Sequence, residues 1–315
     1  MNKTVLTLIR SAAVCGTPAA AHPNNSRAAA GSSTIASLHS QPYISLLVIL
    51  LSFAMVSSIV TRAGETNLTA QSVKLPAKRK IHLYLLMGQS NMAGRGAIEA
   101  EDRTPNPRVL TFTTNGTWEI AVEPVTHDKP KALGVGPGLA FGKAMAETHP
   151  GVTIGLVPCA IGGTPLSRWQ KGGDLYSNAV HRARLAMKAG TLKGILWHQG
   201  ESDSKPGLAE TYGDRLAQMI QDIRADLDSK KLPFVVGQLG EFLYTRQATN
   251  ITEAKLVNDT LANIPGRVPH TGCALSAGLT HKGDQVHFDT ASQREMGRRF
   301  AAEMVRLQES RKRAH

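Results

Sequence analysis

Cysteine is scarce in this sequence. The three cysteines are Cys15, Cys159 and Cys273, and they form neither a C-x-x-C pair nor the Cys/His spacing of a metal site. A structural zinc site is therefore unsupported. Cys15 belongs to the N-terminal segment, which leaves Cys159 and Cys273 as either one disulfide or two small buried thiols.

Aromatic residues, and acidic residues near the N-terminus, are also few. Phe, Trp and Tyr make up 5% of the chain, so wide stacking platforms are not expected and we predict no nucleic-acid partner. The first 64 residues contain four basic residues and no acidic one, within a net charge of +12. This excess suits an anionic partner such as an acidic polysaccharide or a membrane surface, but a basic solvated surface is the simpler interpretation.

The N-terminal residues divide into a polar leader and an apolar run. Residues 1–42 are rich in Ala, Ser, Asn and Thr without periodicity, so we expect no fold there. The uncharged run Tyr43–Val60 is borderline for a membrane span, and residues 43–64 are expected to be a signal or membrane anchor. Basic residues precede this run and acidic residues follow it, which predicts export. The rest of the chain would be secreted, periplasmic or anchored facing outside. A buried core helix is the alternative.

After a linker over residues 65–79, residues 80–310 alternate strand and helix patterns. Strands are predicted at Ile81–Met87, Val152–Val157, Gly194–Trp197 and Phe234–Leu239. Helices are predicted near Pro137–Thr148, Leu175–Ala189, Leu208–Leu227, Thr252–Asn263 and Ala291–Arg311. This alternation predicts one α/β domain with three layers, in which helices cover both faces of a mostly parallel sheet. Functional sites in such domains form at the carboxyl ends of the strands.

A serine follows the first predicted strand in Gly88–Gly94, which reads GQSNMAG. A serine at the exit of a buried strand can present its hydroxyl in a cleft, and as a nucleophile it needs a base nearby. Met92 occupies the last glycine position of a G-x-S-x-G elbow, which argues against the common α/β-hydrolase family. Taken alone, a serine in a glycine-containing turn is more often a loop or helix-cap residue than a nucleophile.

The base could come from the segment before the last helix, where Asp284 and His287 form a D-x-x-H pattern. Asp284 could fix the imidazole tautomer while His287 takes the serine proton. After the strand Gly194–Trp197, Gln199 could donate to an oxyanion, and Glu201 could orient a histidine or hold the loop. Helix capping is the plainer role for that polar segment.

A glycine pair, Gly162–Gly163, follows the strand Val152–Val157. Glycines let backbone N–H groups approach a ligand closely, although an ordinary flexible loop would look the same. Trp169 lies near this pair and could stack on a sugar ring, but core packing explains a tryptophan equally well.

The order of these motifs resembles the SGNH hydrolase superfamily. Within it, the GQSNM and HQGE segments are similar to the sialate O-acetylesterase-like proteins and carbohydrate esterase family 6, which includes acetylxylan esterases. The resemblance covers roughly residues 80–308. It implies a flavodoxin-like fold and hydrolysis of acetyl esters on oligo- or polysaccharides, with no metal or organic cofactor. No protein partner is predicted.

The resemblance also implies roles for single residues. Ser90 matches the nucleophile, with Asp284 and His287 as the rest of the triad. The backbone N–H of Ser90, the N–H of Gly163 (or Gly162, since the register of the pair is open) and the Gln199 amide match the oxyanion hole. Glu201 matches a supporting acidic position.

Three rival interpretations use the same residues. Nucleotide binding is poorly supported, because the glycines at 134–142 have the wrong spacing for G-x-G-x-x-G or a P-loop. A non-catalytic carbohydrate-binding protein on this fold is a second rival, because fold does not fix function. A general short-chain esterase is the third.

Overall fold

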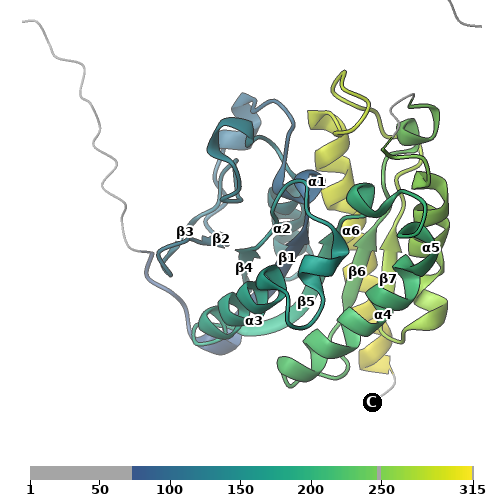
Figure 1. Ribbon diagram of the computed structural model, residues 1–315. Helices are drawn as coiled ribbons and strands as arrows, with labels where there is room; N and C mark the ends of the chain where they lie inside the picture. The colour runs from purple at the N-terminus through teal and green to yellow at the C-terminus, as the bar shows by residue number, and fades with distance from the viewer. Residues whose placement is uncertain (1–72, 247–249, 314–315) are drawn as a thin grey trace, which may run out of the picture. The chain divides into compact units, whose positions relative to one another are not determined.

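The computed structural model describes residues 73–246 and 250–313 (Figure 1). The expected leader over residues 1–42 and the apolar segment 43–64 lie outside the described residues. No helix in the described ranges is both long and apolar enough to cross a membrane.

Seven strands form one sheet in the order β3-β2-β4-β1-β5-β6-β7. The strands are β1 (Ile81–Gly88), β2 (Val109–Phe112), β3 (Trp118–Ile120), β4 (Thr153–Pro158), β5 (Thr191–His198), β6 (Phe234–Gly237) and β7 (Thr271–Ala274). Only β3, at one edge, runs antiparallel to its neighbour. The predicted fold, a mostly parallel sheet in an α/β domain, is confirmed.

Helices cover both faces of this sheet. They are α1 (Ser90–Ala93), α2 (Pro137–Thr148), α3 (Asp174–Ala186), α4 (Ala209–Asp226), α5 (Ala254–Arg267) and α6 (Thr290–Arg313). Short 3₁₀ helices are η1 (Lys78–Lys80), η2 (Ala100–Arg103), η3 (Pro130–Ala132), η4 (Leu166–Trp169), η5 (Glu201–Asp203) and η6 (Glu241–Thr245). Figure 1 shows α3, α4 and α5 on one side of the sheet and α2 and α6 on the other. Side chains of the first three helices belong to one apolar cluster, and those of α2 and α6 belong to a second.

The central strand β1 shows why two covered faces are needed. Leu83 and Leu85 point into the first cluster, whereas Tyr84 and Leu86 point into the second, and all four are fully buried. Successive side chains of a strand alternate between faces, so a continuous apolar run requires both faces to be covered. The helices provide this cover. In α4, Leu216 and the other buried residues recur every three to four positions, so they lie on one side of the helix.

Three strands were absent from the sequence prediction. β2 and β3 are short, and two residues of β3 are exposed. β7 reads TGCA and lacks an apolar run. Each of them is held by pairing with a longer neighbour, so its own sequence carries little signal.

The two cysteines of this domain are free thiols. Cys159 directly follows β4, whereas Cys273 lies in β7, with β1, β5 and β6 between those strands. The alternative of one disulfide is therefore wrong, because three strands of the sheet separate the two cysteines.

The strand order places a crevice at β1. The chain continues from β1 to β2, β3 and β4 on one side, and to β5, β6 and β7 on the other. Loops that leave neighbouring strands in opposite directions open a crevice at their carboxyl ends, which is where ligands bind in such sheets. The segments after β1, β4 and β5 meet there.

Candidate active site

Ser90 lies at the crevice, at the start of α1 and two residues after β1 ends. A sharp turn brings it there. Gly88 has a φ of 135°, and a Cβ at this position would collide with the His198 carbonyl of β5. The N–H of Gln89 donates to that carbonyl at 2.9 Å. Only glycine fits such a close approach, so the glycine before the serine sets the position of the hydroxyl.

Ser90, His287 and Asp284 form a continuous hydrogen-bonded chain. Ser90 Oγ lies 3.0 Å from His287 Nε2, and His287 Nδ1 lies 2.7 Å from Asp284 Oδ2. Asp284 Oδ1 accepts the backbone N–H groups of Val286 and His287 at 2.9 and 2.8 Å. The carboxylate therefore fixes both the ring and the turn that carries it, and the three residues have the geometry of a nucleophile, base and orienting acid.

The electrostatics of this chain suit a neutral base. Burial lowers the pKa of His287, against the opposing effect of the neighbouring Asp284 carboxylate. Burial acts to raise the pKa of Asp284, but hydrogen bonds from His287 and Val286 outweigh it and hold that pKa at about 2. An ionised Asp284 beside an unprotonated imidazole is the state in which His287 can accept a proton.

Asn91, which follows the serine, holds the base in place. Its Nδ2 donates to the Val286 carbonyl at 3.1 Å, and its Oδ1 accepts the Phe288 N–H at 3.1 Å. These two groups flank His287. Sequence reasoning missed this role, although Asn91 lies within the GQSNM segment.

The glycine pair lies beside the serine. The N–H of Gly162 donates to Asp128 Oδ2 at 3.0 Å, and a Cβ on Gly162 would lie 3.5 Å from Ser90 Cβ. Within residues 73–246 and 250–313, the backbone N–H groups of Ser90 and Gly163 have no acceptor. Because the Gly162 N–H already donates to Asp128, Gly163 is the member of the pair whose N–H is available.

Asp128 and Arg95 brace this loop and were not expected from the sequence. Arg95 Nη2 lies 2.6 Å from Asp128 Oδ2, and both side chains are almost fully buried. Arg95 Nη1 also donates to the Gly94 carbonyl at 2.7 Å. Through the Gly162 N–H bond to Asp128, the ion pair connects the segment after Ser90 to the loop after β4. Its two residues lie 33 positions apart in the sequence, which hides the contact from motif reading.

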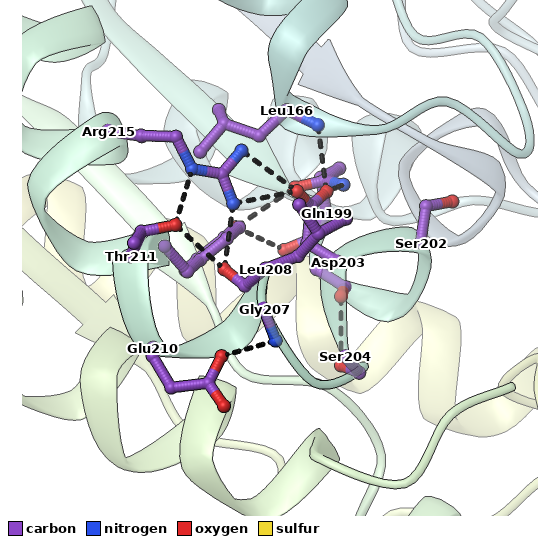
Figure 2. Close-up of polar contacts among 12 residues, drawn as sticks. Leu166, Gln199, Ser202, Asp203, Ser204, Gly207, Leu208, Glu210, Thr211 and Arg215 are labelled. Atoms are coloured by element: carbon purple, nitrogen blue, oxygen red, sulfur yellow. Dashed lines mark hydrogen bonds and ion pairs between the residues drawn. The ribbon is translucent and has the colours of Figure 1, made fainter.

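Gln199 does not lie where an oxyanion donor is needed. Its Nε2 donates to Asp203 Oδ2 at 2.7 Å (Figure 2). The same nitrogen donates to the Thr164 carbonyl at 3.0 Å, and the side chain is fully buried. An amide nitrogen has two hydrogens, so both are used. The expectation that Gln199 donates to an oxyanion is therefore not met by this arrangement.

Glu201 is buried beside Asn91. Its Oε1 accepts Asn91 Nδ2 at 2.6 Å, while its Oε2 is buried with no partner among the described residues. Burial raises the pKa of Glu201 to about 7. Among the described residues, Glu201 reaches the segment that carries the base through Asn91, and its supporting role stays a prediction.

Trp169 packs in the core. It is fully buried, lies edge-on to Trp197 with ring centroids 5.5 Å apart, and donates from Nε1 to Thr164 Oγ1 at 3.1 Å. The alternative of sugar stacking by Trp169 is wrong, because no face of the ring is open.

A pocket of about 610 Å³ opens over Ser90 and His287. Gln89 and Gly163 line it, whereas Gln199 does not. Among the described lining residues, the charged side chains are one acid, Glu201, and four bases: Arg95, Lys129, Lys205 and Arg246. No group of three or more His, Cys, Asp or Glu residues in the described ranges is arranged to hold a metal ion.

Known proteins resemble this chain over the same region. The family model described as "Carbohydrate esterase, sialic acid-specific acetylesterase" matches residues 80–306. A protein of Arabidopsis thaliana described as a "Probable carbohydrate esterase" is 35% identical over 239 residues, covering 68% of this chain and 86% of its own length.

Solved structures agree with the fold. The crystal structure of the Arabidopsis protein aligns with a TM-score of 0.65 at 31% identity, over 73% of this chain and 99% of its own. NanS aligns with a TM-score of 0.62 at 17% identity, over 75% and 100% of the two chains. A carbohydrate acetylesterase from Xanthomonas citri aligns with a TM-score of 0.56 at 21% identity, over 72% and 56%. The last two show the fold alone.

The family match spans most of the chain and includes the serine, glycine-pair, HQGE and D-x-x-H segments. The resemblance seen in the sequence is confirmed. The chain belongs to the sialic acid-specific acetylesterase family of carbohydrate esterases, and it is therefore a carboxylic ester hydrolase.

Proposed function

We propose that this chain removes acetyl groups from O-acetylated carbohydrates, with Ser90 as nucleophile, His287 as general base and Asp284 as the residue that orients the base. The observation that carries the proposal is the hydrogen-bonded chain from Ser90 Oγ through His287 to Asp284 at the pocket. The family match supports the choice of a carbohydrate ester.

In the first step, His287 Nε2 takes the hydroxyl proton while Ser90 Oγ attacks the acetyl carbonyl carbon. The carbonyl oxygen becomes an oxyanion, which the N–H groups of Ser90 and Gly163 would stabilise. The bond between the acetyl carbon and the sugar oxygen then breaks. The sugar oxygen leaves with the proton that His287 had taken.

In the second step, water attacks the acetyl-serine ester and gives its proton to His287. Acetate leaves, and His287 returns a proton to Ser90 Oγ, which restores the starting state. Asp284 stays ionised throughout and stabilises the imidazolium of each step.

An acidic carbohydrate is the substrate class that the charges favour. Lys129, Lys205 and Arg246 bring positive charge to the pocket, and the one acid there, Glu201, is buried with a pKa raised to about 7. A carboxylate on the sugar would gain from this surplus, whereas a neutral acetylated xylan would not. Arg95 contributes less, because Asp128 already pairs with it.

We also propose that residues 43–60 direct export. This proposal rests on the uncharged run and the flanking charges of the sequence. The full chain is expected in the secreted, periplasmic or membrane fraction, whereas a chain with two arginines placed in the run is expected in the cytoplasm. Recovery of both in the cytoplasm would contradict export.

The test of the activity compares acetate release by the full chain and by its Ser90→Ala variant. The substrates are a chromogenic acetate, acetylated xylan and O-acetylated sialic acid. We expect release by the parent alone, with sialic acid preferred over xylan. Release from the chromogenic ester only would favour a general short-chain esterase. Glycan binding by a folded parent that releases no acetate would favour a binding protein.

A further inference from the structure

Gln199 and Asp203 lie beneath the loop that carries Gly163. Asp203 Oδ2 accepts from two donors, Gln199 Nε2 at 2.7 Å and the Leu166 N–H at 2.8 Å (Figure 2). The second hydrogen of Gln199 Nε2 goes to the Thr164 carbonyl at 3.0 Å. The two residues therefore hold the loop at Thr164 and Leu166, directly after the glycine pair.

The orientation of the Gln199 amide is fixed from the other side. Gln199 Oε1 lies 3.0 Å from the Tyr212 hydroxyl, whose one hydrogen is shared with the Gln199 backbone carbonyl at 2.8 Å. The same hydroxyl accepts Trp197 Nε1 at 3.1 Å. If the amide were turned over, its oxygen would face the Thr164 carbonyl and the Asp203 carboxylate, both of which only accept. The observed orientation is the one that satisfies every group.

Arg215 completes the network by neutralising Asp203. Its Nη1 and Nη2 both lie 3.1 Å from Asp203 Oδ1, and its Nε donates to Thr211 Oγ1 at 3.1 Å (Figure 2). Asp203 is fully buried, so its charge needs this forked partner. All of the Asp203 oxygens are engaged, and none is left to face the pocket.

Gly163 itself has little to hold it. Its φ is 74°, and nothing lies within 4 Å of the position that a Cβ would occupy. Its place is set by its neighbours: Gly162 bonds to Asp128 on one side, and Thr164 bonds to Gln199 on the other.

We propose that Gln199 and Asp203 are positioning residues that hold the Gly163 N–H beside Ser90 and do not touch the substrate. This inference rests on the proposed esterase function and assigns Gln199 an indirect part in it. Misplacing a donor has the same consequence as removing one, and the loss of one oxyanion donor typically costs on the order of 10²–10³ in rate.

Gln199→Met and Asp203→Asn test the proposal. Met keeps the length of Gln but has no N–H, and Asn puts donors where Asp203 only accepts. For hydrolysis of a chromogenic acetate, both variants are expected to lower kcat by about 10- to 10³-fold, with KM within about threefold. The rate at which a fluorophosphonate labels Ser90 should fall in proportion to the loss of kcat. The pH midpoint of kcat/KM should not move, since the contacts of His287 are intact.

Asp203→Asn separates positioning from direct donation. This substitution leaves the Gln199 amide present and replaces one oxygen of Asp203 by an NH₂ group. Either the Gln199 and Leu166 donors or the Arg215 guanidinium then lose their acceptor. If Gln199 were itself the oxyanion donor, Asp203→Asn would keep kcat near the parent value while Gln199→Met lost it. That result would overturn the proposal.

Asp102→Asn is the matched control. Asp102 is also a buried carboxylate, bound by the guanidinium of Arg294 at 3.0 and 2.6 Å and by the Glu99 N–H at 2.8 Å. Its contacts do not reach the glycine loop. We expect a similar loss of thermal stability without loss of kcat. An equal loss of kcat in Asp102→Asn would mean that stability alone explains the effect, and this too would overturn the proposal.

Tyr212→Phe covers the case in which Asp203→Asn does not fold. It removes the hydroxyl that fixes the Gln199 amide and leaves the loop contacts in place, so a kcat loss of about three- to tenfold is expected. An inactive parent chain would refute the esterase function, and the inference would fall with it. A parent that depends on Ser90, together with unchanged kcat in Gln199→Met and Tyr212→Phe, would refute the inference alone.

Discussion

Ser90 lies between two segments that differ in burial. On one side is the turn with Asp284 and His287, whose side chains are 36% and 23% exposed. On the other side are Gln199 and Asp203, whose side chains are fully buried. The first segment is held mainly by bonds among neighbours in the sequence, and the second by bonds to residues tens of positions away.

The difference separates two tasks. The turn places His287 at the pocket, where the base passes protons between Ser90, the sugar oxygen and water in every cycle. The buried segment excludes water and keeps its donors and acceptors paired, so it can hold backbone groups without taking part in proton transfer. The predictions that follow disturb one side at a time.

Asp284→Asn should have the largest effect. An amide cannot accept the Nδ1 proton and fix the imidazole as a carboxylate does, so kcat is expected to fall by up to about 10⁴-fold. Steady-state hydrolysis of a chromogenic acetate measures this loss, and circular dichroism checks the fold. A loss below tenfold would show that His287 needs no orienting acid.

Gly162→Ala and Gly163→Ala should differ from each other. A Cβ on Gly162 would collide with the Arg95 guanidinium and lie 2.8 Å from Asp128 Oδ2, so we expect a kcat loss of about 10²-fold as the donor loop moves. Gly163→Ala meets no atom but must adopt a φ of 74°, which costs about 1–2 kcal/mol. Kinetics and thermal unfolding of both variants give the comparison. A larger loss of kcat in Gly163→Ala than in Gly162→Ala would contradict the assignment of Asp128 as an anchor of the loop.

Glu201→Gln should change how stability depends on pH. The pKa of Glu201 is about 7 in the folded protein and about 4.3 in an unfolded chain, so the folded state holds the proton more tightly. Between these values, stability therefore falls as pH rises, by up to about 4 kcal/mol. A glutamine cannot ionise. Denaturant unfolding should show the variant gaining stability relative to the parent from pH 4 to 8. A constant difference would refute the raised pKa.

Lys205→Gln and Arg246→Gln should have the smallest effect. Both residues line the pocket without touching the catalytic chain. KM for an acidic acetylated sugar is expected to rise about two- to fivefold, because an exposed charge pair is worth about 0.2–1 kcal/mol. KM for acetylated xylan should stay unchanged. An equal rise in KM for both substrates would contradict the proposal that the substrate is an acidic carbohydrate.

The two sides of the site also differ in what the sequence reveals. Asp284 and His287 stand three residues apart on one turn, so the pattern already implies their contact. Ser90 follows a strand with a long apolar run, so the sequence already indicates at which edge of the sheet this serine lies. The contacts of Asp203 with Leu166 and of Asp128 with Gly162 join distant segments, and only the folded chain reveals them. Gln199 was placed in the correct segment, but its orientation depends on Thr164 and Tyr212, which no local pattern connects to it.

The burial of β1 has a consequence for how the protein should lose activity. Because this strand lies at the centre of the sheet with both faces covered, the backbone at Ser90 can be displaced only by opening the whole domain. The turn around His287 can open at much lower free energy, because several of its hydrogen bonds are exposed to solvent. Inactivation by denaturant should therefore precede the loss of tryptophan burial, and rapid dilution should restore activity as fast as one loop can close.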